Sequence, residues 1–134
     1  TTDKKINLAV KKDFNKFKFE RTPETVYGIR NFIGNSIKFS KNLTTVSVES
    51  DKDTLSIIID DDGLGFPNDI LDILGEPYIK SKIPSSKSGL GLGTFLGKTL
   101  LNRKNAEVFF KNKGLHNGAR VIIKWKLKDL NTNF

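Results

Sequence analysis

The sequence contains no cysteine and no methionine, and it has a single histidine, His116. These absences exclude a disulfide framework and a thiolate metal cluster, and His116 cannot build a zinc site by itself. The chain also lacks a run of about 18 apolar residues and a signal-peptide pattern at its start. We therefore expect a soluble piece, and the missing initiator methionine indicates that it belongs to a longer protein.

The length and charge limit the possible classes of protein. The 134 residues suffice for one compact domain with a core and are too few for two. A net charge of +8 is compatible with nucleic acid, a membrane surface or phosphates as partners. The lysines, however, are scattered and form neither a dense block nor a basic helix face. The prediction is a single domain over residues 1–134 with no nucleic-acid partner.

Apolar periodicity and turn signals divide the chain into strands and helices. Strands are expected at residues 6–10, 16–20, 46–50, 54–59, 106–111 and 120–127, and helices at 22–40, 68–74 and 93–103. The polar segment 75–88 has no periodicity, which is typical of a mobile functional loop. This order predicts a two-layer α/β sandwich, with a mixed sheet of about five strands and helices on one face.

The first expected helix has two contrasting stripes. Its apolar stripe, which predicts the buried face, consists of Val26, Ile29, Ile33 and Ile37. The opposite row consists of Tyr27, Asn31, Asn35 and Lys38. This row is either an ordinary solvent face or a site for a metal and phosphate, because asparagine is a poor helix former and Mg²⁺ prefers hard oxygen ligands.

An acidic, glycine-containing turn, residues 61–67, follows the apolar strand at 54–59. It is either a simple tight turn or a binding feature. A calcium loop is excluded because no glutamate closes a twelve-residue loop. A buried carboxylate at a strand end can accept a hydrogen bond from an exocyclic amino group such as that of adenine. Gly63 and Gly65 would let the backbone approach the ring closely.

Three alternating glycines, in residues 88–94, open the helix expected at 93–103. Exposed amides and a helix N-terminus favour phosphate binding. A Walker loop is excluded because Leu92 occupies the position of its first glycine. A dinucleotide fingerprint is excluded in both possible registers, by Leu96 in one and by Thr94 in the other.

Taken in order, these motifs resemble the GHKL ATPases, and specifically the ATP-binding catalytic domains of bacterial sensor histidine kinases. The N box resembles residues 31–40, and the two glycine boxes resemble 61–65 and 89–98. A narrower resemblance is to the RegB/PrrB redox-responsive branch, through residues 21–24, 75–78 and 93–101. The resemblance implies a Bergerat-type fold with a flexible ATP lid.

The resemblance also assigns residue roles, with ATP and Mg²⁺ as cofactors. Asn35 would hold Mg²⁺, Lys38 would contact phosphate oxygens, Phe39 would lie against adenine, and Asp61 would bind its amino group; Asn31 and Lys38 would be catalytic. The implied nucleotide-binding residues are Asn31, Asn35, Lys38, Phe39, Asp61, Gly63, Gly65, Tyr78, Lys80, Lys82, Gly89, Leu90, Gly91, Leu92, Gly93 and Thr94.

The chain departs from the family pattern at three places. Ala119 follows Gly118 where threonine is usual, so a hydroxyl near adenine is lost; Thr94 replaces a leucine; and the paired phenylalanines of the F box are not visible. Asn31 also stands where ATP-hydrolysing relatives carry a glutamate, and asparagine is no general base.

The activity implied is transfer of the γ-phosphate of Mg-ATP to a histidine on a separate dimerisation domain, and then to a response regulator. His116 lies in a turn and is not the expected acceptor. We expect a cytoplasmic domain, monomeric alone, belonging to a homodimeric protein of the bacterial inner membrane. The alternatives are a degenerate GHKL nucleotide-binding or scaffold module, and a basic nucleic-acid module that stacks bases on Phe17 and Phe19.

Overall fold

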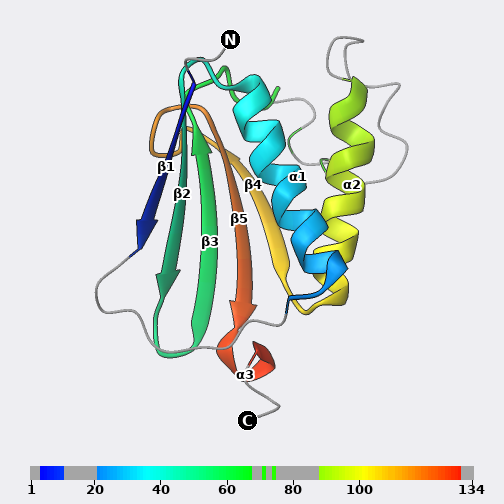
Figure 1. Ribbon diagram of the computed structural model, residues 1–134. Helices are drawn as coiled ribbons and strands as arrows, with labels where there is room; N and C mark the ends of the chain where they lie inside the picture. Colours follow the sequence, from blue (N-terminus) through cyan, green and yellow to red (C-terminus); the bar gives the residue numbers. More distant parts are fainter. Residues whose placement is uncertain (1–3, 11–20, 68–70, 72–73, 75–87, 131–134) are drawn as a thin grey trace.

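The computed structural model describes residues 4–10, 21–67, 71, 74 and 88–130. Within these ranges, a five-stranded sheet carries two long helices on one face (Figure 1). The elements are β1 (Lys5–Val10), α1 (Pro23–Phe39), β2 (Leu43–Ser50), β3 (Thr54–Asp61), α2 (Ser88–Arg103), β4 (Glu107–Asn112), β5 (Ala119–Lys126) and α3 (Leu127–Leu130). The predicted two-layer α/β sandwich is confirmed.

The strand order in the sheet is β1-β2-β3-β5-β4. β1 runs parallel to β2, and the other neighbouring strands are antiparallel, so the sheet is mixed as predicted. β3 lies between β2 and β5, with Thr44 opposite Asp61 and Arg120 opposite Asp60. The last residues of β3 therefore lie beside the first residues of β5, although about 60 residues separate them in the sequence.

Helix α1 begins where the sequence predicts. The Thr22 hydroxyl caps its N-terminus by accepting from the Thr25 N–H at 3.2 Å, and Pro23 occupies the first turn, where no backbone N–H is needed. The helix ends at Phe39, and Ser40 caps it by donating its N–H to the Ser36 carbonyl at 2.9 Å. The expected range of 22–40 is confirmed.

The predicted apolar stripe of α1 is confirmed in part, because Ile29 and Ile33 pack against the core, but it is not the most buried line of the helix. The buried residues are Thr25, Gly28, Phe32 and Ser36, whereas Val26, Ile29, Ile33 and Ile37 are only partly buried. The reason is that α1 packs against α2 as well as against the sheet, so its most enclosed line faces the junction of the two. Phe32 joins Leu101, Ile59, Ile123 and Trp125 in the core.

Other boundaries also differ from the prediction. α2 begins at Ser88, five residues before the expected start at Gly93, and β2 begins at Leu43, three residues before Val46. The short helix α3 was not predicted. The expected strand at 16–20, the segment 75–87 and most of the short helix at 68–74 lie outside the described residues. No helix in the described ranges is both long and apolar enough to cross a membrane.

Candidate functional site

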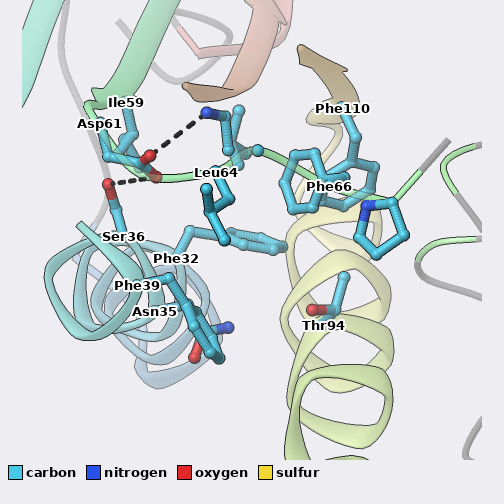
Figure 2. A pocket seen from close by; sticks show the side chains of 14 residues that line it. Phe32, Asn35, Ser36, Phe39, Ile59, Asp61, Leu64, Phe66, Thr94 and Phe110 are labelled. Atoms are coloured by element: carbon cyan, nitrogen blue, oxygen red, sulfur yellow. Dashed lines mark hydrogen bonds between the residues drawn. The ribbon is translucent and has the colours of Figure 1, made fainter. Parts of the chain in front are cut away.

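A cavity of about 110 Å³ opens between α1, the end of β3 and the start of β5 (Figure 2). One wall comes from α1, and the remaining lining residues belong to the sheet, the segment after β3 and α2. Its polar side chains are Asn35, Ser36, Asp61 and Thr94. Complete small-molecule sites measure about 300–1,000 Å³, so the cavity corresponds to one end of such a site.

Asp61 is the one ionisable side chain that lines this cavity among the described residues, and it is only 4% exposed. Its Oδ1 accepts from the backbone N–H of Gly63 at 2.9 Å and of Ala119 at 3.2 Å. Its Oδ2 accepts from the Ser36 hydroxyl at 3.2 Å. Three donors from three different parts of the chain therefore hold the carboxylate of Asp61 in place, as the sequence predicted for a buried acceptor at a strand end.

Aromatic rings form much of the remaining wall. The ring of Phe110 packs edge-on against Phe32, with centroids 5.7 Å apart, and against Phe66, with centroids 5.8 Å apart. Phe39 also lines the cavity, and the Lys38 ammonium lies 5.4 Å from its ring centroid. Apolar, ring-lined walls suit a flat aromatic ligand, which stacks or packs edge-on against such side chains.

The polar row of α1 is divided between three environments. Asn35 lines the cavity, and its Nδ2 is buried without a hydrogen-bond partner. Asn31 Nδ2 instead donates to the Gly93 carbonyl of α2, and the exposed Lys38 lies outside the cavity lining. Of the three residues, the structure therefore brings Asn35 alone to the cavity, whereas Asn31 connects the two helices.

Gly63 and Gly65 make close contacts with the chain itself. A Cβ atom at Gly63 would lie 2.2 Å from the Phe39 carbonyl oxygen, and Gly65 has a φ of +82°. Beside Gly65, the side chain of Asn112 accepts from the Phe66 N–H and donates to the Phe66 carbonyl, both at 2.7 Å. The two hydrogen bonds from Asn112 hold Phe66 at the cavity wall. The glycines contribute separately, because only a residue without a side chain permits this tight turn.

The second glycine-rich segment is helical, which corrects the expectation of a loop entering the helix. Gly89, Leu90, Gly91 and Leu92 belong to the first turns of α2. Glycine lowers helix stability by about 1 kcal/mol per residue without forbidding a helix, so tertiary contacts can override it. Gly93 carries the carbonyl bound by Asn31, and Thr94, 1% exposed, lines the cavity. Tyr78, Lys80 and Lys82 lie outside the described residues.

Several cavity residues were not predicted. Ser36 lies inside the predicted N box but had no assigned role, and Phe66 follows the predicted Gly65 directly. Phe32 also lies inside the predicted N box without an assigned role. Phe110, and Asn112 beside the cavity lining, gave no signal, because their places depend on contacts across the fold. His116 is half-buried in the β4–β5 turn, and its Nε2 pairs with Thr45 Oγ1 at 2.8 Å, away from the cavity lining.

An apolar cavity with a buried carboxylate, on a mixed sheet with helices on one face, is typical of small-molecule binding domains. The chain belongs to the histidine kinase-, DNA gyrase B- and HSP90-like ATPase family, whose model matches residues 24–129. This membership confirms the GHKL resemblance drawn from the three sequence boxes.

The curated relatives include the sensor histidine kinase RegB of Cereibacter sphaeroides, which is 37% identical over 99 residues, or 69% of this chain. The sensor protein DegM of Bacillus sp. (strain B21-2) is 33% identical over 97 residues, or 71% of this chain. This chain spans only 21% of RegB and 25% of DegM. The predicted similarity to the RegB/PrrB branch is confirmed.

Solved structures show the same fold. The mycobacterial sensor histidine kinase MprB matches with a TM-score of 0.72 and 17% identity, over 93% of this chain and 83% of its own. The ATP binding domain of PrrB from Mycobacterium tuberculosis matches with a TM-score of 0.65 and 18% identity, over 90% of this chain and 79% of its own. Full-length ShkA, solved in complex with AMPPNP, matches with a TM-score of 0.67 and 18% identity, over 90% of this chain and 25% of its own.

Proposed function

We propose that this domain binds ATP, with its adenine in the cavity beside Asp61, and that it is the catalytic part of a sensor histidine kinase. The observation that carries the proposal is the buried Asp61 carboxylate in the lining of an aromatic-walled cavity. Adenine is flat and presents an exocyclic amino group, and Asp61 Oδ2 can accept a hydrogen bond from this group. The proposal is supported by the names of relatives: RegB is a sensor histidine kinase, and ShkA was solved with an ATP analogue.

The residues of this site fit Mg²⁺ as a cofactor that is shared with the phosphates. The buried amide of Asn35 has an unpartnered nitrogen, whose hydrogen bonding a bound ligand would complete. Turning this amide would present its oxygen, a hard ligand, and phosphates and waters would complete the shell. No group of three His, Cys, Asp or Glu in the described ranges offers another metal site. When bound, Mg²⁺ supplies neutralisation of phosphate charge.

The chemistry proposed is phosphoryl transfer to a histidine rather than hydrolysis. Asn31 cannot act as a general base, and its amide is engaged with the Gly93 carbonyl. The γ-phosphoryl group would pass to an imidazole nitrogen of a separate domain and leave ADP behind. Lys38, exposed at the end of α1, would approach phosphate oxygens that extend out of the cavity. Roles for Tyr78, Lys80, Lys82 and the 89–92 segment at the phosphates stay predictions.

The proposal includes the rest of the protein. The partners would be dimerisation and phosphoacceptor helices on the same polypeptide and, through them, a response regulator. The isolated domain would be monomeric, and the whole protein would be a homodimer in the bacterial inner membrane with this domain in the cytoplasm. These statements rest on the similarity to RegB and DegM, of which the chain spans a minor part.

The test is calorimetric titration with a non-hydrolysable ATP analogue, with and without Mg²⁺. We expect Asp61→Asn to weaken binding at least about tenfold, because a hydrogen bond to a charged group contributes about 1.5–3 kcal/mol. Asn35→Ala should remove the dependence on Mg²⁺. Asp53→Asn, an exposed aspartate in the β2–β3 turn, is the matched control. Absence of binding by the unaltered domain would favour a degenerate or scaffold module instead.

A further inference from the structure

The Asp61 carboxylate presents its two oxygens to different surroundings. Oδ1 already accepts from two backbone N–H groups, those of Gly63 and Ala119. Oδ2 has one donor among the described residues, the Ser36 hydroxyl. Figure 2 shows this bond crossing from α1 to the end of β3 at the edge of the cavity. Oδ2 is therefore the oxygen with capacity left for a ligand, and Ser36 is the side chain that orients it.

The Ser36 hydroxyl is itself part of a short chain of hydroxyls. Its Oγ lies 3.2 Å from Asp61 Oδ2 and 3.2 Å from Thr44 Oγ1. A hydroxyl has one hydrogen to donate, and a carboxylate can only accept. The hydrogen of Ser36 must therefore point to Asp61, and Thr44 must donate to Ser36. Thr44 is buried in β2, so the chain runs from the core to the carboxylate and polarises Ser36 toward it.

No other side chain replaces this function in the described part of the site. Ala119, on the opposite side of Asp61, offers a backbone N–H to Oδ1 and has no hydroxyl. Ser36 and Asp61 both line the cavity, so the hydrogen bond between them lies at its wall. We infer that Ser36 is a positioning residue for base recognition: it holds Asp61 Oδ2 toward the amino group of adenine and against the oxo group of hypoxanthine or guanine. The inference rests on the proposed function.

The consequence is a role in selectivity, which a merely structural hydroxyl would not have. Adenine offers an N–H donor to Oδ2, whereas hypoxanthine places an acceptor there, and two acceptors repel each other. The preference for ADP over IDP therefore measures how firmly Oδ2 is oriented. If Ser36 only filled space, its removal would lower both affinities by the same factor and leave their ratio unchanged.

The experiment is titration of ADP and IDP, each with Mg²⁺, into the unaltered domain and Ser36→Ala. We expect the preference for ADP to fall about tenfold in Ser36→Ala, the size of one hydrogen bond to a charged group. Ser40→Ala is the matched control, because it removes a buried hydroxyl near the same helix end that donates to the Ile37 carbonyl and not to Asp61. An unchanged ratio of affinities in Ser36→Ala would overturn the inference.

A second variant covers the possibility that Ser36→Ala does not fold. Thr44→Val keeps the shape of the buried side chain but removes the donor to Ser36, so the preference should fall two- to threefold, less than in Ser36→Ala. A rise in preference would mean that Ser36 normally donates to Thr44, and the inference would be wrong. If the unaltered domain fails to bind ADP, the proposed function fails as well. Suppose instead that the unaltered domain binds ADP and that Asp61→Asn abolishes this binding. An unaltered preference for ADP over IDP in Ser36→Ala would then contradict the role of Ser36 and leave the proposed function standing.

Discussion

Asp60 and Asp61 are adjacent in β3 and both buried, yet they belong to different environments. Because side chains alternate along a strand, the two carboxylates point to opposite faces of the sheet. Asp60 forms a salt bridge with Arg120, at 2.7 Å, and also accepts from the Leu115 N–H at 3.1 Å. Asp61 is bound by neutral donors and lines the cavity. One carboxylate therefore supports the β4–β5 turn, and the other is available to a ligand.

This difference predicts that substitution of Asp60 mainly lowers the stability of the fold, whereas substitution of Asp61 mainly lowers the affinity for nucleotide. Asp60→Ala should destabilise the fold by about 2–3 kcal/mol, less than for a fully buried pair because Arg120 is 31% exposed. The bond to Asp60 also raises the pKa of Arg120. Asp61→Asn should cost less stability and more nucleotide affinity. Chemical denaturation and calorimetric titration of both variants check this, and equal losses in both measurements would contradict it.

Asp62 connects the end of β3 to the segment after α1. It accepts from the backbone N–H groups of Lys41, Asn42 and Leu43 at 2.8, 3.1 and 3.2 Å. Burial raises the pKa of Asp62, but these three donors outweigh it and hold the pKa below its ordinary 3.8. A lowered folded-state pKa stabilises the protein above pH 3.8, and this contribution is lost as the pH falls through the folded-state value.

Asp62→Asn should therefore destabilise the domain at neutral pH by about 1 kcal/mol, a value reduced by solvent screening at this partly exposed site. The difference from the unaltered protein should begin to shrink below pH 3.8, where Asp62 of the unfolded chain becomes protonated, and should disappear as the pH falls through the lower folded-state pKa. Urea denaturation at pH 7 and at a series of values descending from pH 3.8 measures both. Asp53→Asn is the control, and a difference that stays constant through the whole acid series would show that the charge is not the cause.

At the scale of elements, α1 and α2 approach each other through glycine. A Cβ atom at Gly28 would lie 2.5 and 2.8 Å from Leu101 side-chain atoms and 3.2 Å from the Gly97 carbonyl oxygen. A Cβ atom at Gly97 would lie 2.8 Å from Asn31 Nδ2. Gly34, also in α1, has nothing within 4 Å of such an atom. The same residue type therefore permits helix packing at two positions and only weakens the helix at the third.

We expect Gly28→Ala to destabilise the domain by about 1–3 kcal/mol, because the added methyl group overpacks the helix junction. Gly34→Ala should stabilise it by about 0.5–1 kcal/mol, because alanine is the better helix former and the site is open. Thermal unfolding of the two variants gives the comparison within one helix. Effects of the same sign would show that the α1–α2 junction is not as close as the structure has it.

At the scale of the whole molecule, the strands of the sheet differ in how well their neighbours shield them from solvent. β3 is paired on both sides, by β2 and β5, and Leu55 and Ile59 are buried in the core. Within the described residues, β1 pairs with β2 alone, and its Ile6 and Leu8 are 57% and 72% exposed. β4 also lies at an edge, but it buries Val108. Stability should therefore decrease from the centre of the sheet toward β1.

Native-state hydrogen exchange should show this gradient. Amides of β3 and β5 should exchange only through global unfolding, and those of β1 through local opening at lower free energy. β4 is the control for edge position, and its amides should exchange more slowly than those of β1. Equal protection of β1 and β3 would mean that the sheet opens as one unit.

Local patterns were sufficient for much of the fold and part of the site. The Thr22-Pro23 cap, the acidic end of β3 and the strand periodicity are properties of neighbouring residues, so the start of α1, the two-layer class and the buried Asp61 were predicted correctly. They failed where two signals competed. The helix was expected to begin at Gly93, but α2 begins at Ser88 and includes the glycines of 88–93 despite the low helix propensity of glycine.

Contacts between distant residues account for the rest. The Asn112–Phe66 and Asn31–Gly93 hydrogen bonds join residues 46 and 62 positions apart, and the Ser36–Asp61 bond joins residues 25 positions apart. No local periodicity encodes such pairs, because they form only when helix and sheet pack together. The sequence alone thus places an acceptor at the end of β3, whereas the packing of α1 on the sheet brings the Ser36 hydroxyl to one of its two oxygens.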